Sequence, residues 1–151
     1  MAATTVGNFS FGALISYIYQ WIQIVIAYVF APKLPQQQVK QKPLGHVAVI
    51  GAGITGISTA SHLIGHGFEV TIFDQADEIG GIWSRVNSTS GLQISSIMYR
   101  FHPAVKWTKG YPHRDEILKN TQKIWKMYEL DQRTRLGFKV EKVTRHSSST
   151  D

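Results

Sequence analysis

A glycine-rich turn between two apolar segments constrains the fold of this chain more than any other feature. Residues 47–50 form the short β-branched run VAVI, and GAGITG follows at once, with glycines at positions 51, 53 and 56. A G-x-G-x-x-G spacing that follows a strand and opens a helix is the fingerprint of a dinucleotide-binding turn. In such a turn Gly51 permits the sharp bend, Gly53 lets the backbone approach a pyrophosphate, and Gly56 lets the helix pack closely on the strand.

The residues after the turn complete a strand–helix–strand unit. Small and apolar residues at helical spacing predict a helix over about residues 54–66, which Gly67 is suited to end. EVTIF (69–73) then predicts a second strand, closed by Asp74, 23 residues after Gly51. We expect the helix N-terminus to bind phosphate and Asp74 to accept hydrogen bonds from ribose hydroxyls. No arginine follows Asp74 directly, so NADP is not expected at this position.

The segment after Asp74 distinguishes a flavin dinucleotide from a nicotinamide dinucleotide. DQADEIGGIW (74–83) carries the glycine pair Gly80–Gly81 and then Trp83. A simple NAD domain usually continues into another helix at this point. The glycine pair instead predicts a loop whose backbone approaches another group closely, with Trp83 as an apolar wall. This pattern favours FAD.

GAGITGISTASHLIGHGFEVTIFDQADEIGGIW (51–83) resembles the N-terminal FAD-binding segment of the flavin-containing monooxygenase superfamily, which includes Baeyer–Villiger and N-hydroxylating relatives. The resemblance implies FAD as the bound cofactor. It places the FAD pyrophosphate on the glycine turn and the ribose on Asp74, where the family more often has Glu. Gly81, Ile82 and Trp83 would line the path towards the flavin. The candidate cofactor-binding residues here are Gly51, Ala52, Gly53, Ile54, Thr55, Gly56, Asp74, Gly81, Ile82 and Trp83.

The similarity continues less specifically to about residue 145. YPHRDEILKNTQKIWKMYEL (111–130) resembles a family segment in which a proline-containing loop leads into a helix, with Asp115 and Glu116 in its first turn. LGFKVEKVTR (136–145) resembles the strand that follows, whose backbone meets the adenine, and Val140 is the candidate for that contact. The expected fold is α/β: an incomplete, three-layer, Rossmann-like FAD-binding domain with a parallel sheet, preceded by one hydrophobic helix.

The N-terminal part of the chain is uncharged. The first 31 residues contain no Asp, Glu, Lys, Arg or His, and residues 9–31 form a 23-residue apolar stretch. A helix of that length rises about 34 Å and can cross a bilayer core. Lys33, Lys40 and Lys42 all follow it, so the positive-inside rule puts the next domain in the cytosol. We expect a membrane anchor, at the endoplasmic reticulum. A helix lying in the membrane interface and a helix docked on another part of the protein remain alternatives.

These features divide the chain into a tail (1–8), a transmembrane or membrane-anchoring helix (9–31), a Pro- and Gln-rich linker (32–45) and the FAD-binding domain (46–151). The net charge of +6 is dispersed, so we expect no nucleic-acid partner. The chain has no cysteine, and His62 and His66 lack an obvious third ligand, so no metal site is predicted.

The resemblance implies an enzyme that uses NADPH and O₂ to oxygenate a small, lipophilic molecule through a flavin C4a-(hydro)peroxide. In that family a second glycine fingerprint binds NADPH, and this sequence lacks one. We therefore expect the chain to be the N-terminal part of such a monooxygenase, with a missing C-terminal portion or second chain as partner. No catalytic residue is predicted. The alternatives are a catalytically inert, membrane-anchored FAD-binding remnant and a flavoprotein oxidoreductase of another class.

Overall fold

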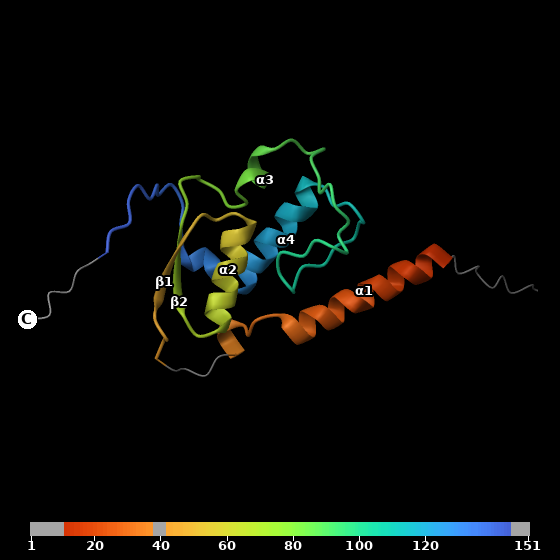
Figure 1. Ribbon diagram of the computed structural model, residues 1–151, viewed down its shortest axis with the longest axis horizontal. Helices are drawn as coiled ribbons and strands as arrows, with labels where there is room; N and C mark the ends of the chain where they lie inside the picture. The colour runs from red at the N-terminus through yellow and green to blue at the C-terminus, as the bar shows by residue number, and fades with distance from the viewer. Residues whose placement is uncertain (1–10, 38–41, 146–151) are drawn as a thin grey trace, which may run out of the picture.

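A computed structural model of the chain describes residues 11–37 and 42–145. Its elements follow the order that the sequence pattern predicts, with an N-terminal helix ahead of alternating strands and helices (Figure 1). They are α1 (Phe11–Phe30), η1 (Pro35–Gln37), β1 (His46–Ile50), α2 (Ile54–Gly65), β2 (Glu69–Phe73), α3 (Ile82–Arg85), α4 (Arg114–Met127), η2 (Leu130–Arg133) and β3 (Thr134–Arg135).

The three strands form a parallel sheet in the order β1-β2-β3. Val47 pairs with Val70 and Ile50 with Phe73, so β1 and β2 end together at the edge where the glycine turn begins. Parallel neighbours require helical crossovers, which α2 and α4 provide. Successive strands joined in this way give the strand order of a Rossmann-like half-domain.

One hydrophobic core lies between the sheet and the helices. The buried side chains of Ile57 in α2 and Ile117 and Ile124 in α4 meet Val70 and Ile72 of β2 in a single cluster. Figure 1 shows α2 and α4 on the same side of the strands. The predicted α/β class with a parallel sheet is confirmed, and the described residues supply the sheet and one helical layer.

The position of the third strand differs from the prediction. The prediction of a strand within residues 136–145 is wrong. The third strand, β3, lies earlier, at Thr134–Arg135, and residues 136–145 contain no strand. The physical reason is that β2 ends at Phe73, so a longer β3 has no neighbour to pair with. The chain turns instead at Gly137, whose φ is 72°, and Phe138 donates its backbone N–H to the Asp74 carbonyl (2.8 Å).

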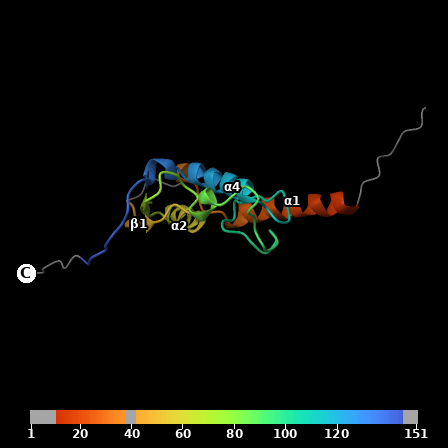
Figure 2. The ribbon, with the colours of Figure 1, turned by 90° about the horizontal axis from the view of Figure 1, so that it is seen from above.

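Helix α1 lies away from the sheet, and its middle contacts the loops that precede α4 (Figure 1 and Figure 2). It is long and apolar enough to cross a membrane, with a mean hydropathy of 1.6 over its most apolar window, of which only 6% is buried. Most of its large apolar side chains are exposed: Phe11, Leu14, Ile15, Tyr17, Ile18, Trp21, Ile22, Ile24, Val25, Tyr28, Val29 and Phe30.

The residues between α1 and β1 contact the domain where the structure describes them. The Tyr128 hydroxyl donates to the Pro32 carbonyl (2.7 Å), and Gln36 donates to the carboxylate of Glu129 (2.6 Å). Leu34 packs against the core. The described parts of the segment predicted as a linker therefore hold the end of α1 near α4.

Candidate functional site

The glycine turn lies at the carboxyl end of β1. Gly51 donates its backbone N–H to the Phe73 carbonyl (2.7 Å), which closes the β1–β2 ladder, and α2 begins three residues later at Ile54. Gly53 is the N-cap of α2, and no side chain caps this end of the helix. The first N–H groups of a helix have no partner within the helix, so the donors of residues 54–56 remain for an external acceptor.

Gly56 brings α2 against the turn. A Cβ atom at this position would lie 1.8 Å from the Gly51 carbonyl oxygen and 3.5 Å from Cγ1 of Val49. Only a residue without a side chain allows this approach, because backbone atoms cannot give way as a flexible side chain can. The role predicted for Gly56, close packing of helix on strand, therefore follows from its surroundings.

The glycine pair at 80–81 returns the chain to this turn. Gly80 donates its N–H to the Ala52 carbonyl (2.9 Å) and forms a parallel bridge with Gly53. Gly81 has a φ of 60°, and a Cβ atom there would lie 3.0 Å from Cα of Gly53. The predicted close approach is thus to the glycine turn itself, and the segment that follows forms the short helix α3 rather than a loop.

Asp74 joins the end of β2 to the turn. Its Oδ2 accepts the Ala52 N–H (2.5 Å), and its Oδ1 accepts the Ala76 N–H (2.8 Å). A carboxylate has about four acceptor positions, so two remain for hydroxyl donors. Asp74 therefore fixes the conformation of the turn and still has acceptors for a ribose.

Two adjoining hollows follow this edge of the sheet, and both include Ile50 and Gly51. The larger has a volume of about 530 Å³ and is lined by Val49, Ile50, Gly51, Gly53, Ile54, Thr55, Gly56, Thr59, Gly80, Ile82 and Trp83. The smaller, of about 320 Å³, is lined by Ile50, Gly51, Phe73, Asp74, Gln75, Phe138, Lys139 and Val140.

The structure brings together most of the candidate residues. Seven of them line the larger hollow, and Asp74 and Val140 line the smaller one beside Gly51. Ala52 is fully buried, with its N–H and carbonyl both used within the domain, and neither it nor Gly81 lines either of these two hollows. The sequence reasoning missed Thr59, which lies one helical turn after Thr55 and could have been found by that spacing.

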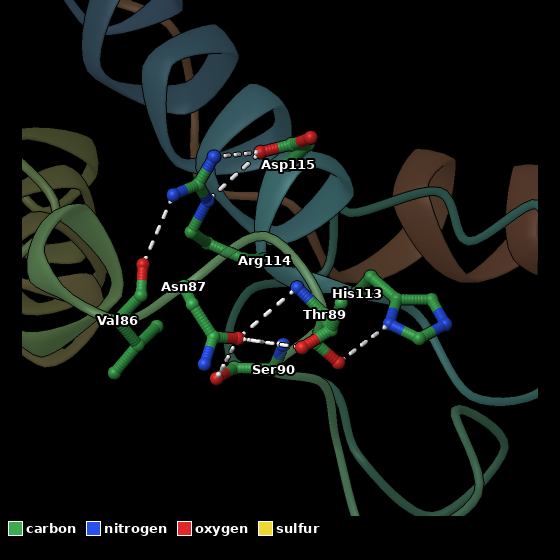
Figure 3. A network of polar contacts seen from close by, with 7 residues as sticks. All are labelled: Val86, Asn87, Thr89, Ser90, His113, Arg114 and Asp115. Atoms are coloured by element: carbon green, nitrogen blue, oxygen red, sulfur yellow. Dashed lines mark hydrogen bonds and ion pairs between the residues drawn. The ribbon is translucent and has the colours of Figure 1, made fainter.

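A polar network holds the segment after Trp83 against α4 (Figure 3). Oδ1 of Asn87 accepts four hydrogen bonds, from the backbone N–H and hydroxyl of both Thr89 and Ser90. Arg114, the first residue of α4, donates its backbone N–H to the Ser90 carbonyl (2.7 Å) and its guanidinium to the Val86 carbonyl (3.0 Å). The wall that contains Trp83 is therefore fixed at its far end by contacts with α4.

His62, one of the two histidines weighed as metal ligands, has other partners. Nδ1 of His62 donates to the Ser58 carbonyl (2.8 Å), and the His62 ring packs edge-on against His102 at 5.0 Å. Burial, with a smaller contribution from His62, lowers the pKa of His102 to about 4. Residues 11–37 and 42–145 contain no group of three metal-ligating side chains.

Comparisons with known proteins agree with this geometry. The family model described as "FAD dependent oxidoreductase" matches residues 46–143. The chain is 32% identical over 101 residues to a flavin-containing monooxygenase of Aspergillus flavus, covering 64% of this chain and 25% of that protein. It is 30% identical over 102 residues to a Baeyer–Villiger monooxygenase of Pseudomonas aeruginosa, covering 64% and 19%. The chain thus spans a quarter or less of the length of these relatives.

Solved structures show the same relationship. A steroid monooxygenase bound to NADP superposes with a TM-score of 0.54 at 26% identity, covering 61% of this chain and 19% of that one. A cyclohexanone monooxygenase from Rhodococcus sp. Phi1, bound to NADP⁺, gives 0.52 at 28% identity, covering 64% and 20%. The predicted resemblance to flavin-containing and Baeyer–Villiger monooxygenases is confirmed. On its sequence and fold, the chain belongs to the FAD-dependent oxidoreductase family.

Proposed function

We propose that this chain is the FAD-binding N-terminal part of a flavin-dependent monooxygenase that uses NADPH and O₂ to oxygenate a small lipophilic molecule. The observation that carries the proposal is the pair of adjoining hollows on either side of Gly51, at the carboxyl ends of β1 and β2. Open α/β sheets bind their ligands at this edge. The relatives named above support the reaction class.

The residues present fit a dinucleotide. The uncapped N-terminus of α2 offers backbone N–H groups to a pyrophosphate beside Gly53, where no side chain intervenes. Asp74 offers its two remaining acceptor positions to a ribose in the smaller hollow, and Val140 is part of the apolar wall there for an adenine. Phosphates would thus lie between the two hollows.

The opposite end of the larger hollow suits a flavin. Ile82 and Trp83 form an apolar wall there, and Trp83 also packs against the core. When bound, FAD would supply the redox and oxygen chemistry, and these side chains would exclude water from it. The sequence contains one glycine fingerprint, so we assign no NADPH site to these residues.

We also propose that α1 attaches the chain to a membrane, with the domain on the cytosolic side of the endoplasmic reticulum. The support is the exposed apolar surface of α1 and the lysines that follow it, Lys33 and Lys42, which suit the anionic cytoplasmic leaflet. A large exposed apolar patch of this kind is characteristic of a membrane or protein contact.

Titration of the whole chain with FAD tests the cofactor assignment through quenching of flavin fluorescence. Gly53→Ala is the informative variant, since its Cβ would meet Gly81 at an ordinary 3.6 Å and leave the fold intact while narrowing the cleft. We expect FAD affinity to fall roughly tenfold, or about 1.4 kcal/mol. Gly110→Ala is the matched control, because nothing lies within 4 Å of its Cβ position. Absence of quenching by the wild-type chain would refute the assignment.

A further inference from the structure

One polar edge of α1 is bound to the domain at the middle of the helix. Gln23, fully buried, accepts the backbone N–H of Trp107 (2.6 Å) and donates to the carbonyl of the same residue (3.0 Å). Gln20 also donates to that carbonyl (3.3 Å), and the Tyr19 hydroxyl contacts the Ser96 hydroxyl (3.1 Å). We call this set of contacts the Gln23 clamp.

The clamp cannot coexist with a membrane-spanning α1. The helix has 20 residues and is about 30 Å long, so its middle would lie at the centre of a bilayer core of similar thickness. Trp107 would lie there too, together with the Arg100 guanidinium, which donates to Gln23 (3.2 Å). Irregular backbone exposed to lipid does not occur at that depth, and a buried arginine is costly there.

Breaking the clamp would also be unfavourable. A detached, spanning α1 would carry Gln23 into hydrocarbon without its hydrogen bonds and would leave the N–H and carbonyl of Trp107 without these partners. Apart from Ser16 and the hydroxyls of Tyr17 and Tyr28, the exposed side chains on the remaining faces of α1 are apolar and need no such partners. The clamp therefore favours an α1 that keeps its polar edge on the domain while its other faces contact an apolar environment outside the protein.

The surroundings of the clamp suit the surface of a bilayer. Ile97 and Met98, next to Ser96, are 72% and 81% exposed and extend the apolar surface beyond α1. Lys106 and Lys109 are exposed on either side of Trp107, and Lys33 is exposed just after the helix. Apolar side chains beside lysines match the acyl and anionic layers of a membrane interface.

We infer that α1 lies in the plane of a lipid surface, held along the domain by the Gln23 clamp, and that the chain is attached to one leaflet without crossing it. The inference rests on the proposed membrane attachment and specifies its geometry. It also places the dinucleotide domain directly at the lipid surface, where a lipophilic substrate would be concentrated.

Binding and extraction separate this inference from the proposed attachment. The whole chain is mixed with vesicles of phosphatidylcholine and phosphatidylserine, floated, and then extracted with alkaline carbonate. We expect flotation with the vesicles and release by carbonate. Flotation with resistance to carbonate would refute the in-plane geometry alone. A chain that does not float with the vesicles, whether it stays monomeric or associates with itself, would refute the membrane attachment as well.

A pair of matched variants tests the role of the clamp. Gln23→Leu removes its hydrogen bonds and raises the hydropathy of α1, and we expect it to convert most of the floated chain to a carbonate-resistant form. Ser16→Leu, at an exposed position outside the clamp, also adds a leucine and should leave the chain extractable. If both variants became equally resistant to carbonate extraction, hydropathy and not the clamp would decide the geometry, and the inference would be overturned.

Cross-linking on the vesicles reports the clamp directly. The chain has no cysteine, so Tyr19→Cys with Ser96→Cys introduces one defined pair for a short bis-maleimide. We expect intramolecular cross-linking in vesicle-bound chain, and much less for the control pair Tyr28→Cys with Ser96→Cys, since Tyr28 is 90% exposed and about 13 Å further along the helix. Equal yields from the two pairs would show that α1 leaves the domain in the membrane.

Discussion

Substitution of Gly56 by alanine tests the packing of the dinucleotide turn. The added Cβ would lie 1.8 Å from the Gly51 carbonyl oxygen and 3.0 Å from its carbonyl carbon. Carbon and oxygen atoms ordinarily meet at about 3.3 Å, so α2 and the turn would have to separate by roughly 1.5 Å. Neither the turn nor α2 can shift easily. Gly51 in the turn is held to Phe73 by a 2.7 Å hydrogen bond, and Ile57, next to Gly56 in α2, is fully buried.

The expected cost is at the upper end of the range for overpacking, about 3 kcal/mol. For a domain of about 100 residues this lowers the melting temperature by roughly 12–24 °C. The assay is thermal unfolding of the whole chain in mild detergent, followed by circular dichroism. Gly110→Ala is the control and should change the free energy of unfolding by less than about 0.5 kcal/mol. A Gly56→Ala chain that melts with the wild type would refute the packing argument.

Three further substitutions test contacts around the site. Asp74→Asn replaces one acceptor of the Ala52 and Ala76 N–H groups by a donor, so we expect a loss of about 1–3 kcal/mol in urea unfolding and weaker FAD binding; unchanged stability would contradict the contact. Asn87→Ala removes an oxygen that accepts four hydrogen bonds and should cost about 1 kcal/mol, whereas Asn87→Asp, which keeps the acceptor, should not. Burial lowers the pKa of His102 from 6.5 to about 4, so between these pH values the imidazole is protonated in the unfolded chain and neutral in the folded chain. Stability should therefore fall as pH decreases from 6.5 towards 4, by at most about 3 kcal/mol, and His102→Phe should flatten that slope in a series of urea midpoints at different pH.

The elements around the glycine turn were predictable because they depend on neighbours in sequence. The spacing of the glycines, the apolar runs of β1 and β2 and the helical periodicity of α2 all lie within residues 46–74, and the structure has those elements with ends shifted by one residue at most. The acidic first turn of α4 was equally local. Asp74 was expected to face a ribose, but its bond to the Ala52 N–H depends on the fold of the turn.

Other features could not be read from local pattern. Residues 136–145 have the composition of a strand, yet β3 ends at Arg135 because the partner strand ends at Phe73. The glycine pair predicted a close approach without its partner, which the structure identifies as Gly53. The contribution of Asn87 to the wall beside Trp83 could not be predicted from its sequence neighbours, because it depends on how the segment after Trp83 packs against α4.

The sequence by itself determined the family, the dinucleotide turn and the apolar character of α1, since each depends on residue types at fixed spacing within one segment. Only the tertiary structure decided where α1 is held, because Gln23 meets its partner Trp107 across 84 residues of chain. In the sequence, Gln20 and Gln23 only weakened the hydropathy of a membrane helix. In the folded chain they satisfy the backbone N–H and carbonyl of a loop, because polar groups withdrawn from water must find partners.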